Sequence, residues 1–328
     1  MASSNSGYCS ILFAGSLCLM GLLPMDSWAA SCCGGGSSSS LIMPKFSRAM
    51  VDMSVDMEDY NGFWDSQGDY RPDPKDSDLN QYRINLGYAH RFGSRWQGSV
   101  ILPYVWNNNE YTGLTSNTQG LGDTTLNLWY ETFDNVTCVW KVRQWADLKP
   151  AVYLGASLTV PTGISRFDNV ANSFDITGRG FYRLDANLLV DKTIYPWNAS
   201  LLLSYGKYLE RNVNRDYGNY VEPSRRKLGD RQLATLSAGY TYFLESMDTL
   251  TFTLALSHLQ EDDGRIDGRP DPSTRMEKNS LAGTVAWSTM DRDWIFKGTL
   301  SHAVPRNDWG DNFPVTNVLS FEVSHVLR

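Results

Sequence analysis

The feature that most constrains this chain is an alternation of apolar and polar residues, which recurs from about residue 49 to the end. In the first such segment, Ala49, Val51, Met53, Val55 and Met57 alternate with mostly polar neighbours. Successive side chains of a strand point to opposite faces, so the pattern predicts strands that are apolar on one face only. About twelve segments show it, near 49–57, 81–88, 96–106, 126–131, 152–160, 182–191, 197–208, 231–243, 249–259, 279–289, 294–304 and 316–327.

The lengths of the connections indicate which all-β fold these strands form. Short links are found near 92–94, 191–196, 244–248 and 290–293. Long polar links alternate with them, at 58–78, 107–122, 161–180, 209–230, 260–278 and 305–315, and one further extended link covers 134–149. Bacterial outer-membrane barrels have short periplasmic turns and long outer loops. We therefore expect residues 46–328 to form a closed antiparallel transmembrane β-barrel of about twelve strands.

Aromatic residues on the apolar faces gather at the two ends of the predicted strands, as in the interfacial girdles of membrane barrels. The expected periplasmic girdle consists of Tyr88, Trp96, Tyr130, Trp197, Tyr242, Trp287 and Trp294. The expected outer girdle consists of Tyr82, Tyr104, Trp106, Tyr182 and Tyr205.

The bulk composition agrees with a barrel that has lipid as its partner. Mean hydropathy is −0.34, and residues 30–328 contain no apolar run of the roughly 20 residues that a spanning helix needs. A barrel needs no such run, because only every second strand residue meets lipid. The net charge of −7 argues against nucleic acid as a partner.

The first 29 residues resemble a secretory signal peptide. Residues 10–23 form an apolar stretch that Pro24 ends, and Ser27-Trp28-Ala29 offers small residues for cleavage after Ala29. An N-terminal membrane anchor is the alternative. Residues 30–45 are rich in Cys, Gly and Ser and are expected to form a flexible periplasmic tether. The barrel would then lie in the outer membrane of a Gram-negative cell.

Three cysteines remain after cleavage, namely Cys32, Cys33 and Cys138, all expected on the periplasmic side. The run Ala29-Ala30-Ser31-Cys32 resembles a lipoprotein site, so Cys32 is a candidate for lipidation. The thiols have three interpretations: a tail without a role, a disulfide to Cys138, or capture of a soft metal or metalloid. No metal site and no cofactor is predicted from the sequence.

Charged residues on the polar faces are the candidates for a transport path. A lipid-facing Arg or Lys at the bilayer midplane costs about 2–4 kcal/mol, so these side chains are expected to point into the lumen. There they either pair with one another or line a wet path. The candidates are Arg48, Asp52, Asp56, Arg83, Asp123, Glu131, Arg183, Asp185, Asp191, Lys297 and Glu322.

Enzyme activity is not expected. The four histidines, His90, His258, His302 and His325, have the lipid-facing parity. Ser-His pairs occur only as direct neighbours, and neighbours in a strand point to opposite faces, so no Ser–His catalytic pair is supported. The acidic outer loops, including the repeated Arg-Pro-Asp-Pro at 71–74 and 269–272, match no dedicated calcium loop.

Four short motifs at strand ends carry a family resemblance: Pro103-Tyr104, Gly120-Leu121-Gly122-Asp123, Pro161-Thr162-Gly163 and Thr177-Gly178-Arg179-Gly180. Their order resembles the outer-membrane barrels grouped as the phenol-degradation meta-pathway transporter family (MetA-pathway type). The resemblance begins near residue 80 and is best over 100–190. It implies a twelve-stranded barrel that passes small, often apolar molecules. The Cys-Cys-Gly-Gly-Gly start and the link at 134–149 depart from that pattern.

Two functions follow as hypotheses. The first is an outer-membrane pore or transporter for small apolar or anionic solutes, in which the tether could reach into the lumen as a plug. The alternative is a barrel without transport, which acts as a scaffold or as partner of a periplasmic electron-transfer or metalloid-handling system. A conducting lumen favours the first, and a co-purifying haem protein favours the second.

Overall fold

The computed structural model describes residues 41–45, 47–132 and 138–328. The expected signal peptide, most of the tether, Cys32 and Cys33 lie outside these residues. In the described parts of the chain, no helix is long and apolar enough to cross a membrane.

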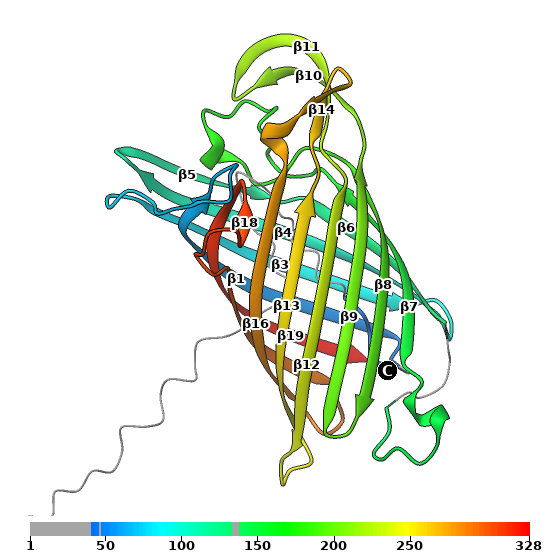
Figure 1. Cartoon of the computed structure of the whole chain (residues 1–328). Helices are drawn as coiled ribbons and strands as arrows, with labels where there is room; N and C mark the ends of the chain where they lie inside the picture. Colours follow the sequence, from blue (N-terminus) through cyan, green and yellow to red (C-terminus); the bar gives the residue numbers. More distant parts are fainter. Residues whose placement is uncertain (1–40, 46, 133–137) are drawn as a thin grey trace, which may run out of the picture.

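Twelve antiparallel strands close into one barrel, in which each strand pairs with its neighbour in sequence (Figure 1). The strands are β1 (Ala49–Trp64), β3 (Asp78–Arg91), β4 (Trp96–Tyr111), β6 (Thr124–Glu131), β7 (Ala151–Val160), β8 (Arg183–Ile194), β9 (Trp197–Tyr208), β12 (Arg231–Phe243), β13 (Thr249–Glu261), β16 (Met276–Ser288), β17 (Trp294–His302) and β19 (Phe313–Leu327). The first and last strands close the ring, with Ala49 opposite Leu327 and Trp64 opposite Phe313. The ladder therefore has no open edge in the membrane, as a lipid environment requires.

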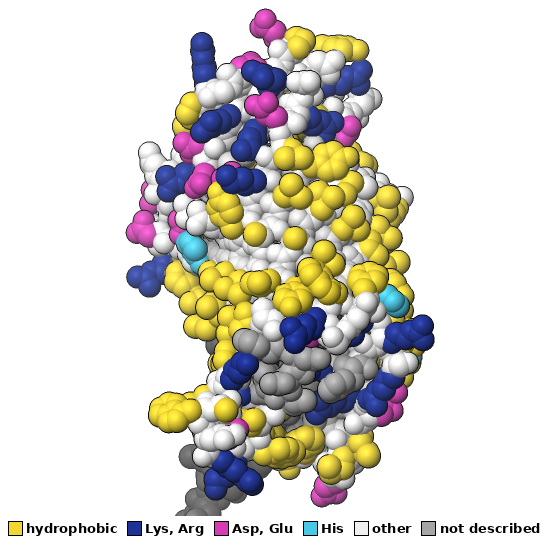
Figure 2. All heavy atoms as spheres, turned by 90° about the vertical axis from the view of Figure 1, so that its right-hand side faces the viewer, with side chains coloured by type: hydrophobic (Ala, Val, Ile, Leu, Met, Phe, Trp, Pro, Cys, Tyr) yellow, Lys and Arg dark blue, Asp and Glu magenta, His cyan; other side chains and the backbone are white. Residues whose placement is uncertain are grey.

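The wall is apolar outside and polar inside, the reverse of a soluble sandwich. Leu128 and Leu203 keep 44% and 39% of their surface exposed, although each lies in the middle of a strand. Asp52 and Asn127, of the opposite parity, are buried. Figure 2 shows hydrophobic side chains over the middle of the wall and charged side chains toward the ends. The alternation of apolar and polar residues along each strand thus gives the barrel a lipid-facing outer surface and a polar lumen.

The expected girdle aromatics lie on the outer surface at the two ends of the wall. Ten of the twelve are exposed. The other two are half-buried against a girdle partner, with ring centroids 4.8 Å apart for Tyr130 and Trp96 and 5.0 Å apart for Trp106 and Tyr104. These amphipathic rings are suited to the headgroup levels of the bilayer.

The outer connections are more ordered than the sequence predicts. The remaining strands are β2 (Tyr70–Arg71), β5 (Leu114–Leu121), β10 (Arg211–Asp216), β11 (Asn219–Lys227), β14 (Gly264–Ile266), β15 (Arg269–Asp271) and β18 (Gly310–Asp311). The 3₁₀ helices are η1 (Trp145–Leu148), η2 (Ser173–Asp175) and η3 (Pro272–Thr274). Expecting plain polar links at 107–122, 209–230 and 260–278 was therefore wrong. Polar strands in water lack the apolar alternation that identifies the wall, although their backbones pair equally well.

A second, small sheet covers the outer mouth. Its strands follow the order β10–β11–β14–β15, and Figure 1 shows it beyond the ends of the wall strands. Both hairpins have a turn with positive φ, at Tyr217-Gly218 and at Asp267-Gly268. Glycine adopts this region without a Cβ clash. We call the sheet, residues 211–227 and 264–271, the outer cap.

Candidate transport path through the barrel

Three of the motifs found in the sequence meet at the outer rim. The carboxylate of Asp123 accepts hydrogen bonds from the backbone N–H of Gly163 (3.1 Å) and of Arg179 (2.7 Å). The hydroxyl of Thr177 donates to the carbonyl of Leu121 (2.6 Å), and that of Thr162 donates to the carbonyl of Gly122 (2.6 Å). The motifs thus fasten both ends of the loop 161–182 beside β6.

Glycine is required where this junction is tightest. A Cβ at Gly178 would lie 2.2 Å from Oδ1 of Asp123, closer than atoms can approach. The backbone of the loop 161–182 therefore lies in direct contact with the carboxylate of Asp123. From there it turns over the lumen, because the side-chain amide of Asn107 donates to the carbonyl of Ile176 (2.9 Å). Thr118 adds a hydrogen bond to Asp175 (2.7 Å).

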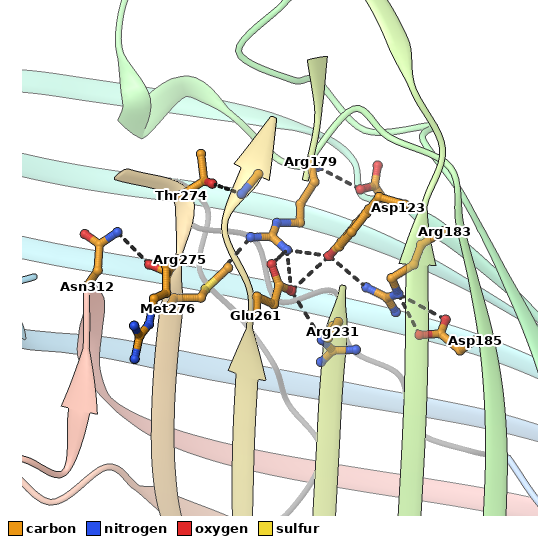
Figure 3. A network of polar contacts seen from close by, with 12 residues as sticks. Asp123, Arg179, Arg183, Asp185, Arg231, Glu261, Thr274, Arg275, Met276 and Asn312 are labelled. Carbon is orange, nitrogen blue, oxygen red and sulfur yellow. Dashed lines mark hydrogen bonds and ion pairs between the residues drawn. The ribbon is translucent and has the colours of Figure 1, made fainter. Parts of the chain in front are cut away.

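Arg179 carries this loop into a buried ionic network (Figure 3). Its guanidinium binds the carboxylate of Glu261 on β13 at 2.5 Å. Glu261 also accepts from the hydroxyl of Tyr208 (2.9 Å) and lies 3.4 Å from Nε of Arg231. Arg183 binds Asp185, two residues further on the same face of β8, at 2.8 Å. We call Arg179, Arg183, Asp185, Arg231 and Glu261 the constriction.

The constriction is dry. Arg231 and Glu261 each expose 2% of their surface, and the side chain of Arg179 exposes 10%. Charges buried this deeply must be paired, since each costs several kcal/mol to desolvate. Three guanidiniums against two carboxylates leave a positive balance, which Asp123 offsets from the rim.

An outer vestibule lies above the constriction, beneath the outer cap, with a volume of about 470 Å³. Its charged lining is mainly basic, namely Arg166, Arg179, Arg226, Lys227 and Arg265 against Asp216 and Asp271. Its apolar lining consists of Phe167, Ile176, Phe181, Leu228, Ile266 and Met276. Two guanidiniums hold the pKa of Asp216 below its ordinary value, because their hydrogen bonds outweigh the effect of its partial burial.

An inner chamber of about 500 Å³ lies in the periplasmic half of the lumen. Its charged lining is mainly acidic, with Asp52, Asp56, Asp191 and Glu322 against Lys297. Hydroxyls complete it: Ser324 donates to Asp52 (2.6 Å) and Ser320 donates to Asp56 (2.7 Å). Lys297 forms an ion pair with Glu322. The two cavities therefore differ in the sign of their charge.

The described end of the tether closes the inner chamber from below. Leu41 and Met43 are buried with Met50, Ala89, Ile101 and Val326 in an apolar cluster. The backbone N–H of Met43 donates to the side chain of Gln97 (2.7 Å). Lys45 pairs with the buried carboxylate of Glu131 at 2.8 Å. Residues 41–45, which we call the N-terminal segment, thus occupy the lumen.

Comparison with known proteins identifies the family. A family model described as "Putative MetA-pathway of phenol degradation" matches residues 60–322. The chain belongs to this family. The fold is similar to that of the COG4313 outer membrane channel from Pseudomonas putida F1, with a TM-score of 0.67 and 15% identity over 90% of this chain and 100% of that one. The β-domain of the Bordetella autotransporter BrkA gives a TM-score of 0.47 at 12% identity, over 85% and 98% of the two chains. No curated protein sequence matches.

These findings confirm the expected resemblance and the outer-membrane barrel. Most predicted path residues also lie where parity places them. Asp52, Asp56, Arg83, Asp123, Glu131, Arg183 and Asp185 are buried toward the interior. Asp191, Lys297 and Glu322 are half-buried in the wall of the inner chamber. Their role in transport stays a prediction.

Arg48 is the exception, and placing it among the lumen residues was wrong. It precedes β1 and is exposed at the end of the barrel. Its parity matches Asp52 and its backbone still bonds to Leu327 and Arg91, but at the end of the barrel this parity no longer buries the side chain.

Four buried charged residues were not among the candidates. Arg231 and Glu261 belong to the constriction, Glu58 lies 3.8 Å from Arg83, and Lys278 donates to Thr316 (2.6 Å). Glu58, Glu261 and Lys278 fell in segments predicted to be loops, while Arg231 began a predicted strand. Extending the alternation by a few residues at each outer strand end would have found Glu58, Glu261 and Lys278, and Arg231 already lay within a predicted strand.

The structure describes only some of the residues on which the cysteine and histidine predictions rest. Cys138 is exposed and free, whereas its suggested partners lie outside the described residues. The four histidines are half-buried near strand ends, as in the pair His302 and Asn317. No cluster of three metal-binding side chains occurs within residues 41–45, 47–132 and 138–328.

Proposed function

We propose that this barrel is an outer-membrane channel that passes small solutes, apolar or anionic in character, toward the periplasm. The observation that carries the proposal is a polar lumen with two cavities inside a lipid-facing wall. A barrel that served only as a scaffold would gain nothing from hollow, charge-lined space at both ends of its lumen.

The two barriers along the lumen indicate that passage is controlled. The constriction lies beneath the outer vestibule, and the N-terminal segment lines the inner chamber from inside the lumen. Both consist of side chains that can rearrange while the hydrogen-bonded wall stays intact. The similar barrel from Pseudomonas putida F1 is an outer membrane channel, which supports the same function here.

The test is conductance of the purified full-length protein in planar lipid bilayers, paired with a widened variant. Arg179→Ala removes the side chain that joins the loop 161–182 to Glu261, so we expect a larger single-channel conductance than in the wild type. Arg269→Ala, an exposed change in the outer cap, is the matched control and leaves conductance unchanged. If neither the wild type nor Arg179→Ala conducts, the channel function is wrong.

A further inference from the structure

The outer vestibule has two guanidiniums on one carboxylate at Asp216. Arg166 binds Asp216 through two bonds, Nε to Oδ1 (2.8 Å) and Nη2 to Oδ2 (2.7 Å). Arg226 reaches the same carboxylate, with Nη1 at 2.9 Å from Oδ2. One negative charge thus serves two positive ones.

A donor of Arg226 is left over. Its Nε is buried and has no hydrogen-bond partner among the described residues. A buried donor without an acceptor costs about 1–3 kcal/mol, and more when the group is charged. The same side chain lines the vestibule, so an anion placed in the cavity would meet a positive charge that shares its one carboxylate partner with Arg166.

Aromatic rings lie beside this charge. Phe167 and Phe181 pack edge to face, with centroids 5.3 Å apart, and both line the vestibule. The guanidiniums of Arg166, Arg211 and Arg226 lie 5.8, 5.1 and 5.9 Å from the centre of the Phe167 ring. An apolar group bound here loses water against the rings, while a charged group beside it meets the arginines.

We propose that the outer vestibule is a binding site for a small organic monoanion with an apolar ring, such as an aryl carboxylate. The carboxylate is held at Arg226 and the ring rests against the phenylalanines. The proposal deepens the channel function and rests on it, because the vestibule is the outer entrance of the same lumen. The proposal adds a specific binding site and a ligand class, whereas a channel can conduct without either.

The two halves of the site exclude other ligand classes. A small inorganic anion would meet the arginines but would gain nothing from the apolar lining of the vestibule. A neutral aromatic molecule would contact the apolar lining but would leave the surplus positive charge of the vestibule without a counter-charge. Only a ligand with both parts matches both halves, so benzoate should bind more tightly than acetate or benzyl alcohol.

The test is titration calorimetry on the full-length protein in detergent, with benzoate, acetate and benzyl alcohol as probes. We expect wild-type protein to bind benzoate at least about tenfold more tightly than either fragment probe, a difference of about 1.4 kcal/mol. Arg226→Gln should weaken benzoate binding about tenfold or more, and Phe167→Leu should weaken benzoate but not acetate. Arg269→Gln removes a positive charge from the same cap outside the vestibule and should change nothing.

Because Arg226 also supports the outer cap, a second, conservative substitution separates loss of the ligand contact from loss of the fold. Arg226→Lys keeps the charge but loses the planar fork, and it should bind benzoate with an affinity between those of wild type and Arg226→Gln. Equal binding of benzoate and acetate, or of benzoate and benzyl alcohol, would overturn the proposal. A conducting protein that binds no benzoate overturns the site but not the channel. Benzoate binding by a barrel that never conducts overturns the channel but not the site.

Discussion

The outer and inner halves of the lumen are built by different means. In the inner chamber, two of the carboxylates accept from a hydroxyl of the neighbouring strand, Asp52 from Ser324 and Asp56 from Ser320. In the outer half, the partners come from loops and distant strands: Arg166 pairs with Asp216 across 50 positions, and Arg179 pairs with Glu261 across 82. The inner half follows from strand register, whereas the outer half depends on loops that fold back over the mouth.

The difference also separates two kinds of electrostatics. The inner chamber is acidic and hydroxyl-lined, with residual space between its walls. The outer half is rich in guanidinium, and its centre is closed by direct ion pairs. A solute that enters from outside therefore meets positive charge first and negative charge later. Substitutions that remove single charged groups from each half test whether this order of charges along the lumen affects transport.

The largest effect is expected at the constriction. Glu261→Gln keeps the shape of the side chain but leaves Arg179 and Arg231 without their shared negative charge. Loss of one partner from a buried ionic group costs about 3–5 kcal/mol, so we expect a drop of this size in the free energy of unfolding. Urea unfolding in lipid vesicles measures it. Glu222→Gln, exposed on β11, should stay within about 0.5 kcal/mol of wild type.

The next effect concerns the closure of the inner half. Replacing residues 41–45 by a Gly-Ser sequence of equal length removes the apolar anchors Leu41 and Met43 and the Lys45–Glu131 pair. We expect single-channel conductance to rise about twofold or more, because the segment leaves the lumen. Arg48→Gln, at the same end but exposed, is the control. Unchanged conductance would mean that the N-terminal segment does not restrict the path.

The smallest effect is expected from the charge of the inner chamber. Asp52→Asn together with Asp191→Asn removes two of its carboxylates without removing volume. We expect the preference for cations over anions to fall roughly twofold, measured as a reversal potential across a KCl gradient. Asp291→Asn, in the exposed turn between β16 and β17, should leave the potential as it is. If both variants behave alike, the inner acids do not select ions.

The same contrast decides how far the sequence could predict the site. Asp185 and Glu131 were found because each sits at an inward position of a recognisable strand, where period two leaves one choice of face. Arg179 was noticed only as part of a glycine motif, since no periodicity links a loop residue to Glu261. The extra strands of the outer cap went unpredicted for a related reason, because Val213 and Val221, which pack on the apolar cluster beneath them, are too few to form an alternating pattern.

The sequence by itself determined the wall: twelve lipid-facing strands, aromatic ends, a polar interior, and turns short on one side and long on the other. Alternation suffices there because hydrocarbon outside and polar groups inside penalise every misplaced side chain separately. Only the tertiary structure decided what fills and closes the lumen. These features depend on contacts between segments far apart in the chain, which no local pattern encodes. They are the burial of Leu41 and Met43 in the lumen, the inward loop at Asp123, and the carboxylate of Asp216 that two arginines share.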